Sequence, residues 1–282
     1  MLKIENITYG YNAMHNVLEN FSLSYEEPGI YGLLGKNGTG KSTLLYLIMG
    51  LLRPKQGEIT LNGANTQERL PESLQEMFIV PEEYNLPSIP LPDYLKVLRP
   101  FYPNFDEQLM VKLLQEFDML NVNGATLNEN GIPQINLGAL SMGQKKKVFM
   151  SFALAAGTKV LLMDEPTNGL DIPSKSQFRK VVAQYMTEDR TLIISTHQVH
   201  DVESLLDHIL ILSQQKLLLD AAVAEITEKY VFEYRTPDEM EDALYAEPSL
   251  QGNAVIAPCK ADSAETQVNL ELLFNAVTQG KI

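Results

Sequence analysis

The chain has 282 residues, of which 45% are hydrophobic, enough for one large core and a small appended domain. Its formal net charge of -14 at pH 7 would repel a long phosphate backbone, so we expect no nucleic-acid partner, although a small nucleotide can bind where local positive charge is supplied. There is one cysteine, no signal-peptide apolar region and no apolar run of about 18 residues, so we expect a cytosolic chain without an intrachain disulfide that does not itself span a membrane.

The first 34 residues predict β-strands. Apolar residues recur with a period near two, which is typical of half-buried strands, at Leu2, Ile4 and Ile7 and again at Phe21, Leu23 and Tyr25. Tyr11 follows the first strand in a turn-prone segment that could fold over a bound ligand, and its ring could stack on a nucleotide base. Tyr9 is the competing candidate, and a packing role for either ring is the alternative.

A phosphate-binding loop follows the predicted buried strand 29–34. The run from Gly35 to Ser42 matches G-x-x-x-x-G-K-[ST], and 44–49 predicts the helix after it. Glycines let successive backbone N–H groups point inward and cradle phosphate oxygens, and the helix N-terminus adds positive potential. Lys41 would reach the terminal phosphates and the Ser42 hydroxyl would hold Mg²⁺. The predicted nucleotide-binding residues are Gly35, Asn37, Gly38, Thr39, Gly40, Lys41, Ser42 and Thr43.

The middle of the chain predicts a helical insertion between strands. Residues 58–63 predict a strand and turn, and 77–80 a short strand ended by Pro81. Helices are predicted at 94–99, inside a proline-dense stretch, and at 107–119, so about 83–155 forms the insertion. The continuous apolar runs 160–163 and 192–195 fit strands buried on both faces of a parallel sheet.

Ser141 predicts the start of another helix. It is a good N-cap, and Gly143 lets a backbone approach an anion at the helix N-terminus. The lysines 145–147 that follow are expected on a solvated helix face rather than in a nucleic-acid patch.

Two carboxylates follow the strand 160–163 directly. The carboxyl end of a parallel strand faces the crevice where ligands bind, so we expect Asp164 to hold Mg²⁺ and Glu165 to orient or deprotonate the attacking water. Two surface acids at a strand end are the alternative, which the preceding phosphate loop disfavours. His197 follows the strand 192–195 and could contact the γ-phosphate, whereas the other three histidines are expected to be ordinary surface or helix residues.

The tail after about residue 220 predicts a small α+β unit. Strands are predicted at 230–234 and 253–257, and helices at 238–245 and 269–278.

Taken together, residues 1–220 resemble an ATP-binding cassette (ABC) ATPase. The motifs occur in the family's order: an aromatic A-loop (Tyr11), Walker A (35–42), the Q-loop region, a signature (Leu140-Ser-Met-Gly-Gln144), Walker B (160–164) with Glu165, a D-loop (168–171) and an H-loop (195–197). The resemblance implies an α/β P-loop NTPase core with a mixed sheet, an antiparallel β subdomain, a helical signature-motif subdomain (about 83–155) and a small α+β C-terminal extension (221–282).

The resemblance also implies a mechanism and partners. ATP and Mg²⁺ would be bound in a head-to-tail dimer, homodimeric or heterodimeric with a second ABC subunit, in which Ser141, Gly143 and Gln144 complete the partner's site. Hydrolysis would drive transport through separate integral membrane permease subunits, which would hold the chain at the cytoplasmic face of the cell membrane. The tail resembles those of bacterial exporter-type subunits, and residues 83–94 match the family's permease-contacting groove.

The sequence departs from the family pattern at two positions. Met142 replaces a signature glycine, at a site where family members vary. Glu82 occupies the position of the Q-loop glutamine, a neutral Mg²⁺ ligand, and brings a negative charge that can bind Mg²⁺ more strongly. We hypothesise that Glu82 still senses the γ-phosphate and ligates Mg²⁺.

Two other functions compete with transport. A soluble ABC ATPase could act as a switch on a nonmembrane protein partner. A noncatalytic binding module is the third possibility, and the intact Lys41, Asp164, Glu165 and His197 argue against it.

Overall fold

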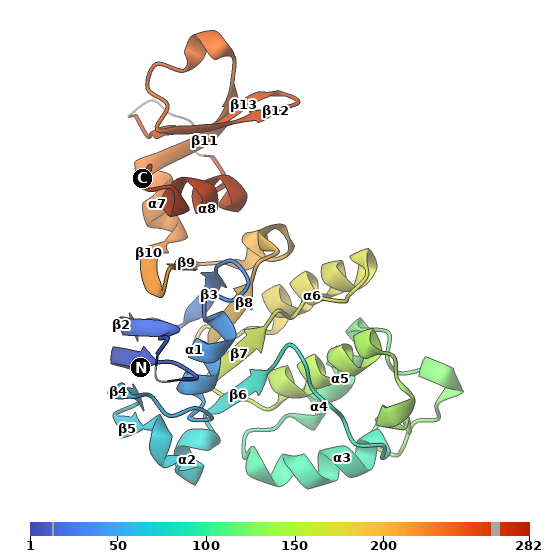
Figure 1. Ribbon diagram of the computed structural model, residues 1–282. Helices are drawn as coiled ribbons and strands as arrows, with labels where there is room; N and C mark the ends of the chain where they lie inside the picture. Colours follow the sequence, from blue (N-terminus) through green and yellow to red (C-terminus); the bar gives the residue numbers. More distant parts are fainter. Residues whose placement is uncertain (13, 261–265) are drawn as a thin grey trace.

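A six-stranded sheet forms the centre of the protein (Figure 1). The computed structural model describes residues 1–12, 14–260 and 266–282. The strand order is β10-β9-β3-β8-β7-β6. Its parallel strands are β3 (Gly29–Leu34), β6 (Met77–Val80), β7 (Val160–Asp164), β8 (Thr191–Thr196) and β9 (His208–Ser213), and β10 (Lys216–Ala222) pairs antiparallel with β9. The sheet is therefore mixed, as predicted.

Both faces of this sheet are covered. Alternate residues of β7 enter two separate cores, Leu161 and Met163 one of them and Val160 and Leu162 the other, which is why the strand is a continuous apolar run. One core is shared with α1 (Lys41–Ile48) and an antiparallel sheet, β2-β1-β4-β5. The strands of that sheet are β1 (Leu2–Tyr9), β2 (Leu18–Tyr25), β4 (Gln56–Leu61) and β5 (Ala64–Asn65).

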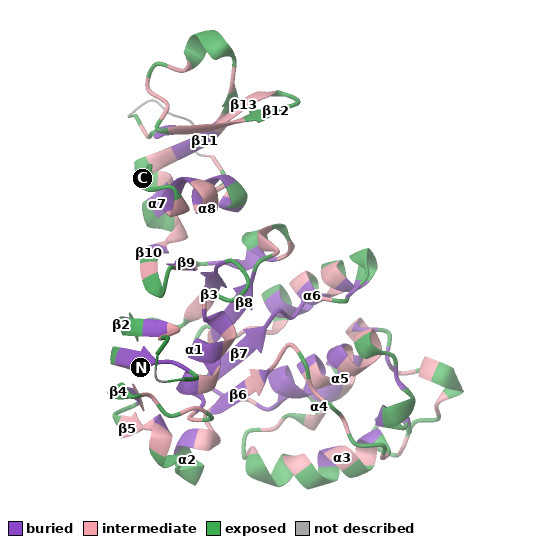
Figure 2. Ribbon diagram, viewed as in Figure 1, coloured by how far each residue is buried: buried purple, intermediate pink, exposed green. Residues whose placement is uncertain are grey.

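The opposite face carries the helical insertion. Buried residues concentrate where α5 (Met142–Ala155) of the insertion and α6 (Ile172–Tyr185), which follows β7, approach the central strands (Figure 2). Helices α3 (Leu91–Leu98) and α4 (Glu107–Glu116) complete the insertion. Helix α3 begins three residues before the predicted start, because a proline is tolerated in the first helical turn. Helix α4 ends at Glu116 rather than at the predicted residue 119, and Asp118 just beyond it has a left-handed φ of 58° that cannot continue the helix. A short helix α2 (Pro71–Leu74) precedes β6.

The tail forms its own three-stranded sheet above the core (Figure 1). Helix α7 (Val223–Lys229) leads into β11 (Tyr230–Arg235), and β12 (Tyr245–Ser249) and β13 (Gly252–Pro258) follow, with α8 (Leu270–Thr278) packed below. Helix α8 meets the segment that follows His197, where His200 Nε2 lies 2.9 Å from Glu271 Oε2. The domain boundary near residue 220 stays a prediction, and β10 runs across it.

The predicted helix 238–245 is wrong. Only the 3₁₀ turn Pro237–Glu239 forms, and Leu244 N donates to Ile256 O where β12 begins to pair with β13. Met240 and Ala243, two apolar residues of this segment, cover one face of the small sheet. Sheet hydrogen bonds satisfy this backbone better than one isolated helical turn would.

Among the residues that the structure describes, no helix has the length and apolar character needed to cross a membrane.

Candidate ATPase site

The phosphate-binding loop connects β3 to α1, as predicted. Gly38 and Gly40 have left-handed φ values of 81° and 103°. A Cβ on Gly40 would lie 2.8 Å from Val17 Cγ1, so both the backbone conformation and the close packing require glycine there. The loop ends at the N-terminus of α1, whose first N–H groups have no intrahelical acceptor and favour an anion.

Lys41 lies inside the loop. Its Nζ donates to Gly35 O at 2.7 Å and Lys36 O at 3.3 Å, and lies 3.7 Å from Glu165 Oε1. Burial lowers the pKa of Lys41, and the Glu165 and Asp164 carboxylates oppose that shift. The loop therefore presents a desolvated cation at the place where phosphate oxygens would bind.

Asp164 and Ser42 face each other across this site. Burial raises the pKa of Asp164, and hydrogen bonds from the hydroxyls of Ser195 and Ser42 oppose the shift. Hydroxyl and carboxylate oxygens are the ligands that Mg²⁺ prefers, usually one or two protein groups together with substrate phosphates. Within the described residues no three His, Cys, Asp or Glu side chains come close enough to hold a metal by themselves. The residues therefore fit a Mg²⁺ ion that Asp164 and Ser42 would hold together with phosphate oxygens, whose negative charge the metal would neutralise.

Glu165 is the most constrained residue of the site. Its φ of 45° is left-handed, a strain on the order of 1–3 kcal/mol that is typical of functional sites. The buried carboxylate accepts from Thr196 Oγ1 at 2.9 Å and from His197 N at 3.1 Å, and His197 Nδ1 lies 2.8 Å from Glu165 Oε1. The carboxylate and the imidazole, which come from neighbouring strand ends, are thus held together beside Lys41.

Glu82 follows β6 and reaches the D-loop. Its Oε1 accepts from Asn168 Nδ2 at 2.8 Å, and its charge acts on Lys41, on Lys146 and on Asp164. Glu82 therefore lies close enough to the site for its charge to act on the residues there. Its role as a Mg²⁺ ligand and γ-phosphate sensor stays a prediction.

Lys146 was wrongly predicted on a solvated face. It is only 5% exposed, and its Nζ donates to the main-chain oxygens of Glu165 and Asn168, each at 2.9 Å. Helical spacing could have indicated this burial, because Lys146 lies on the same helix face as Met150 and Ala153, four and seven residues further on, which are fully buried. Asn168, Ser195 and Thr196 are further site residues whose side-chain contacts no motif spacing specified.

The signature residues begin α5 as predicted. The Ser141 hydroxyl accepts from Gln144 N at 3.2 Å, and Gln144 Oε1 accepts from Ser141 N at 3.0 Å, which is a capping box. A Cβ on Gly143 would touch nothing closer than 3.8 Å, so packing within the chain does not require glycine there. A contact of Ser141, Gly143 and Gln144 with a second subunit stays a prediction.

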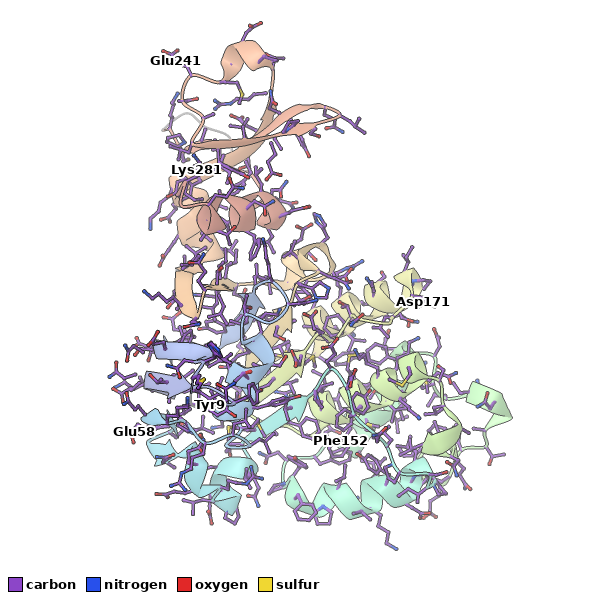
Figure 3. The ribbon with its side chains drawn as sticks, in the orientation of Figure 1. Tyr9, Glu58, Phe152, Asp171, Glu241 and Lys281 are labelled. Atoms are coloured by element: carbon purple, nitrogen blue, oxygen red, sulfur yellow. The ribbon has the colours of Figure 1, made fainter. Side chains whose placement is uncertain are left out.

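The two tyrosines near the loop pack edge to face, with ring centroids 5.2 Å apart, but differ in exposure. Tyr9 is 9% exposed in β1, while Tyr11 is 65% exposed and its hydroxyl lies 3.0 Å from Thr43 Oγ1. Figure 3 shows Tyr9 among the side chains of the central sheets and Asp171 at the outer end of α6. Tyr11 is thus the ring available beside the loop.

The fold and the site together define a P-loop ATPase. The ABC transporter family model matches residues 18–168, and the chain belongs to this family. It is 30% identical over 224 residues to the manganese transport system ATP-binding protein MntA of Synechocystis, a match that covers 76% of this chain and 81% of that protein. It is 29% identical over 284 residues to the phosphonates import ATP-binding protein PhnC of Wolinella succinogenes, covering 94% and 100%.

Solved structures agree with the fold. An ATP-binding subunit of an ABC transporter superposes with a TM-score of 0.66 at 23% identity, covering 80% of this chain and 91% of that one. An Atm1-family bacterial ABC exporter with ATP bound also gives 0.66, at 20% identity, covering 79% and 39%. The chain is therefore a Mg²⁺-dependent ATPase, an ATP-binding subunit of the ABC transporter family.

Proposed function

We propose that two copies of this subunit, or one copy and a similar ABC subunit, close over two ATP molecules and drive separate membrane permease subunits. The observation that supports a dimer is the exposure of large apolar side chains at the signature and beside the D-loop, the two segments that would face a partner. Met142 in the signature is 63% exposed and Ile172, next to the D-loop, is 83% exposed. Burial of these side chains against a second subunit would remove apolar surface from water, which favours the closed form.

Each chain would supply half of each site. Lys41, Ser42 and Asp164 would hold the polyphosphate and its Mg²⁺, Glu165 would take a proton from the attacking water, and His197 would contact the γ-phosphate. The capped N-terminus of α5 would present Ser141 and Gly143 to the nucleotide of the partner, where an anion is favoured. Once water has cleaved the γ-phosphate and the phosphate has left, the charge that both halves bind would be gone and the dimer would open.

The permease partners are proposed from the relatives. MntA and PhnC are named as ATP-binding proteins of a transport system and of an import system, and other relatives are named for zinc uptake and for lantibiotic transport. The chain would accordingly lie at the cytoplasmic face of the cell membrane through its permease. Export, which the tail suggested, stays a prediction.

Co-purification tests the permease proposal. From detergent-solubilised membranes of the cells that express it, the tagged chain should recover polytopic membrane proteins, identified by mass spectrometry. Glu83→Lys, in the exposed segment that leads from the Q-loop into α3, should reduce this recovery, whereas Glu188→Lys, an exposed charge after α6, should not. Recovery from cytosol with a soluble partner alone would instead support the switch function.

Tyr11 gives a second, independent prediction. Tyr11→Ala should weaken ATP binding by about five- to 150-fold, because stacking of a base on an aromatic ring is worth roughly 1–3 kcal/mol. Tyr11→Phe keeps the ring, loses only the contact with Thr43, and should bind within about threefold of the wild type. Titration of a fluorescent ATP analogue measures both. Equal losses in the two variants would show that the hydroxyl matters and the ring does not.

A further inference from the structure

A lysine that no motif singled out holds the turn between Walker B and the D-loop. Lys146 Nζ donates to Glu165 O and to Asn168 O, and Asn168 N closes the same turn on Glu165 O at 3.1 Å. We propose that Lys146 is a positioning residue of the ATPase that fixes this turn and balances the carboxylate of Glu82, so that Lys146 and Glu82 act as a matched pair. The proposal needs only the ATPase activity and would stand without a permease.

The hydrogen bonds show why this position suits a lysine. Both acceptors are main-chain carbonyls of one four-residue turn, and one belongs to Glu165, whose left-handed φ of 45° has to be maintained by its surroundings. An ammonium group carries three donors and satisfies both carbonyls at once with charge-assisted hydrogen bonds, which are stronger than neutral ones. Lys146 therefore joins the signature helix to the main chain of Glu165, the residue proposed as general base.

The charges show why Glu82 belongs to the same unit. Burial lowers the pKa of Lys146, and the largest opposing influence is the charge of Glu82, ahead of Glu165 and Asp164. Asn168 bridges the two residues, since its carbonyl accepts from Lys146 and its side-chain amide donates to Glu82. The glutamate at the Q-loop is a third carboxylate of the site, after Asp164 and Glu165. Lys146 is a second cation of the site, in addition to Lys41.

A purely structural tether is the competing explanation, and the neighbouring lysine provides the control. Lys147 Nζ also donates to two acceptors, Phe117 O at 3.3 Å and Gln177 Oε1 at 2.9 Å, but these lie between α4 and α6 rather than at Walker B. Lys147→Gln removes the same group from the next position of the same helix, where the side chain is half-buried. It reports what the loss of a tethered lysine does by itself.

The test measures how the Mg²⁺ concentration for half-maximal binding of a fluorescent ATP analogue changes, before any turnover. We expect Lys146→Gln to lower it, because Glu82 then binds the cation without competition, and Glu82→Gln to raise it, each by roughly two- to tenfold. The double variant should lie within about twofold of Glu82→Gln, because without Glu82 the lysine has no carboxylate to compete for, and Lys147→Gln should not shift it. A tether without an electrostatic role would not give shifts of opposite sign.

Turnover and amide exchange complete the test. Each single variant should lose about tenfold in kcat and the double variant about threefold, since residues that share contacts do not contribute additively. In the nucleotide-free protein, Lys146→Gln should speed hydrogen exchange in the turn 165–168, and Lys147→Gln should leave it unchanged. Losses in kcat that multiply in the double variant, or equal exchange in the two lysine variants, would overturn the proposal. An ATPase-inactive wild type would refute the activity itself and not this pairing, which the binding and exchange measurements test separately.

Discussion

We expect Glu165→Gln to bind ATP with near wild-type affinity and to hydrolyse it roughly 10²–10⁴-fold more slowly, the contribution of a well-placed general base. The carboxylate is 4% exposed and held by the Thr196 hydroxyl and by His197 N, so it is fixed beside Lys41 and the loop. Glutamine has the same size and keeps one oxygen to accept those hydrogen bonds, but it cannot take a proton from water. Single-turnover hydrolysis and titration of a nucleotide analogue separate the two effects.

The same variant tests the dimer. If ATP closes two subunits and hydrolysis opens them, Glu165→Gln should elute as a dimer in ATP and Mg²⁺ and as a monomer without nucleotide, measured by size exclusion with light scattering. Glu83→Gln, an exposed carboxylate one residue beyond Glu82, is the control and should hydrolyse ATP normally. Turnover of Glu165→Gln within threefold of the wild type would remove Glu165 from the role of general base.

The sequence predicted the central architecture well because its signals are local. Continuous apolar runs mark β7 and β8, and Ser141, a good N-cap residue, marks the start of α5. The tail was harder, because the spacing of Met240 and Ala243 fits both a helical turn and a loop that covers a sheet. The strand pairing of β12 with β13, which decided between them, is a contact between separate segments that periodicity cannot report.

The site was predicted as a set of residues but not as a network. Motif spacing located Lys41, Asp164, Glu165 and His197, and the structure brings Lys41 and His197 to the same carboxylate. The bridge from Glu82 through Asn168 to Lys146 joins β6, the D-loop and α5, which the fold alone brings together. The sequence likewise predicted that Lys146 is exposed to solvent, because charged residues usually are. The main-chain oxygens that accept its hydrogen bonds belong to a turn about 20 residues further along the chain, which the local sequence does not indicate.

Lys41→Met is expected to have the other large effect, a loss of about 10²–10³-fold in kcat/KM, comparable with removal of one preorganised donor from a charged transition state. Lys41 Nζ sits within the loop, bound to Gly35 O and Lys36 O and 3.7 Å from Glu165 Oε1. Methionine keeps much of the side-chain length but brings no charge to the phosphates. Steady-state ATPase kinetics measure the loss, and Lys36→Met, which removes an exposed lysine of the same loop, should stay within about threefold of the wild type.

Lys41→Met should not lower the thermal stability of the nucleotide-free protein, although it lowers the activity. Burial lowers the pKa of Lys41 although Glu165 and Asp164 oppose it, so the folded chain holds the ammonium less favourably than water does. Glu165 retains the Thr196 and His197 hydrogen bonds when the lysine is removed. The thermal unfolding midpoint of nucleotide-free Lys41→Met at pH 7 should therefore equal or exceed that of the wild type, and added ATP and Mg²⁺ should raise it less. A midpoint several degrees lower, with Lys36→Met unchanged, would mean that Lys41 mainly holds the loop together and that the kinetic loss reports a misfolded site.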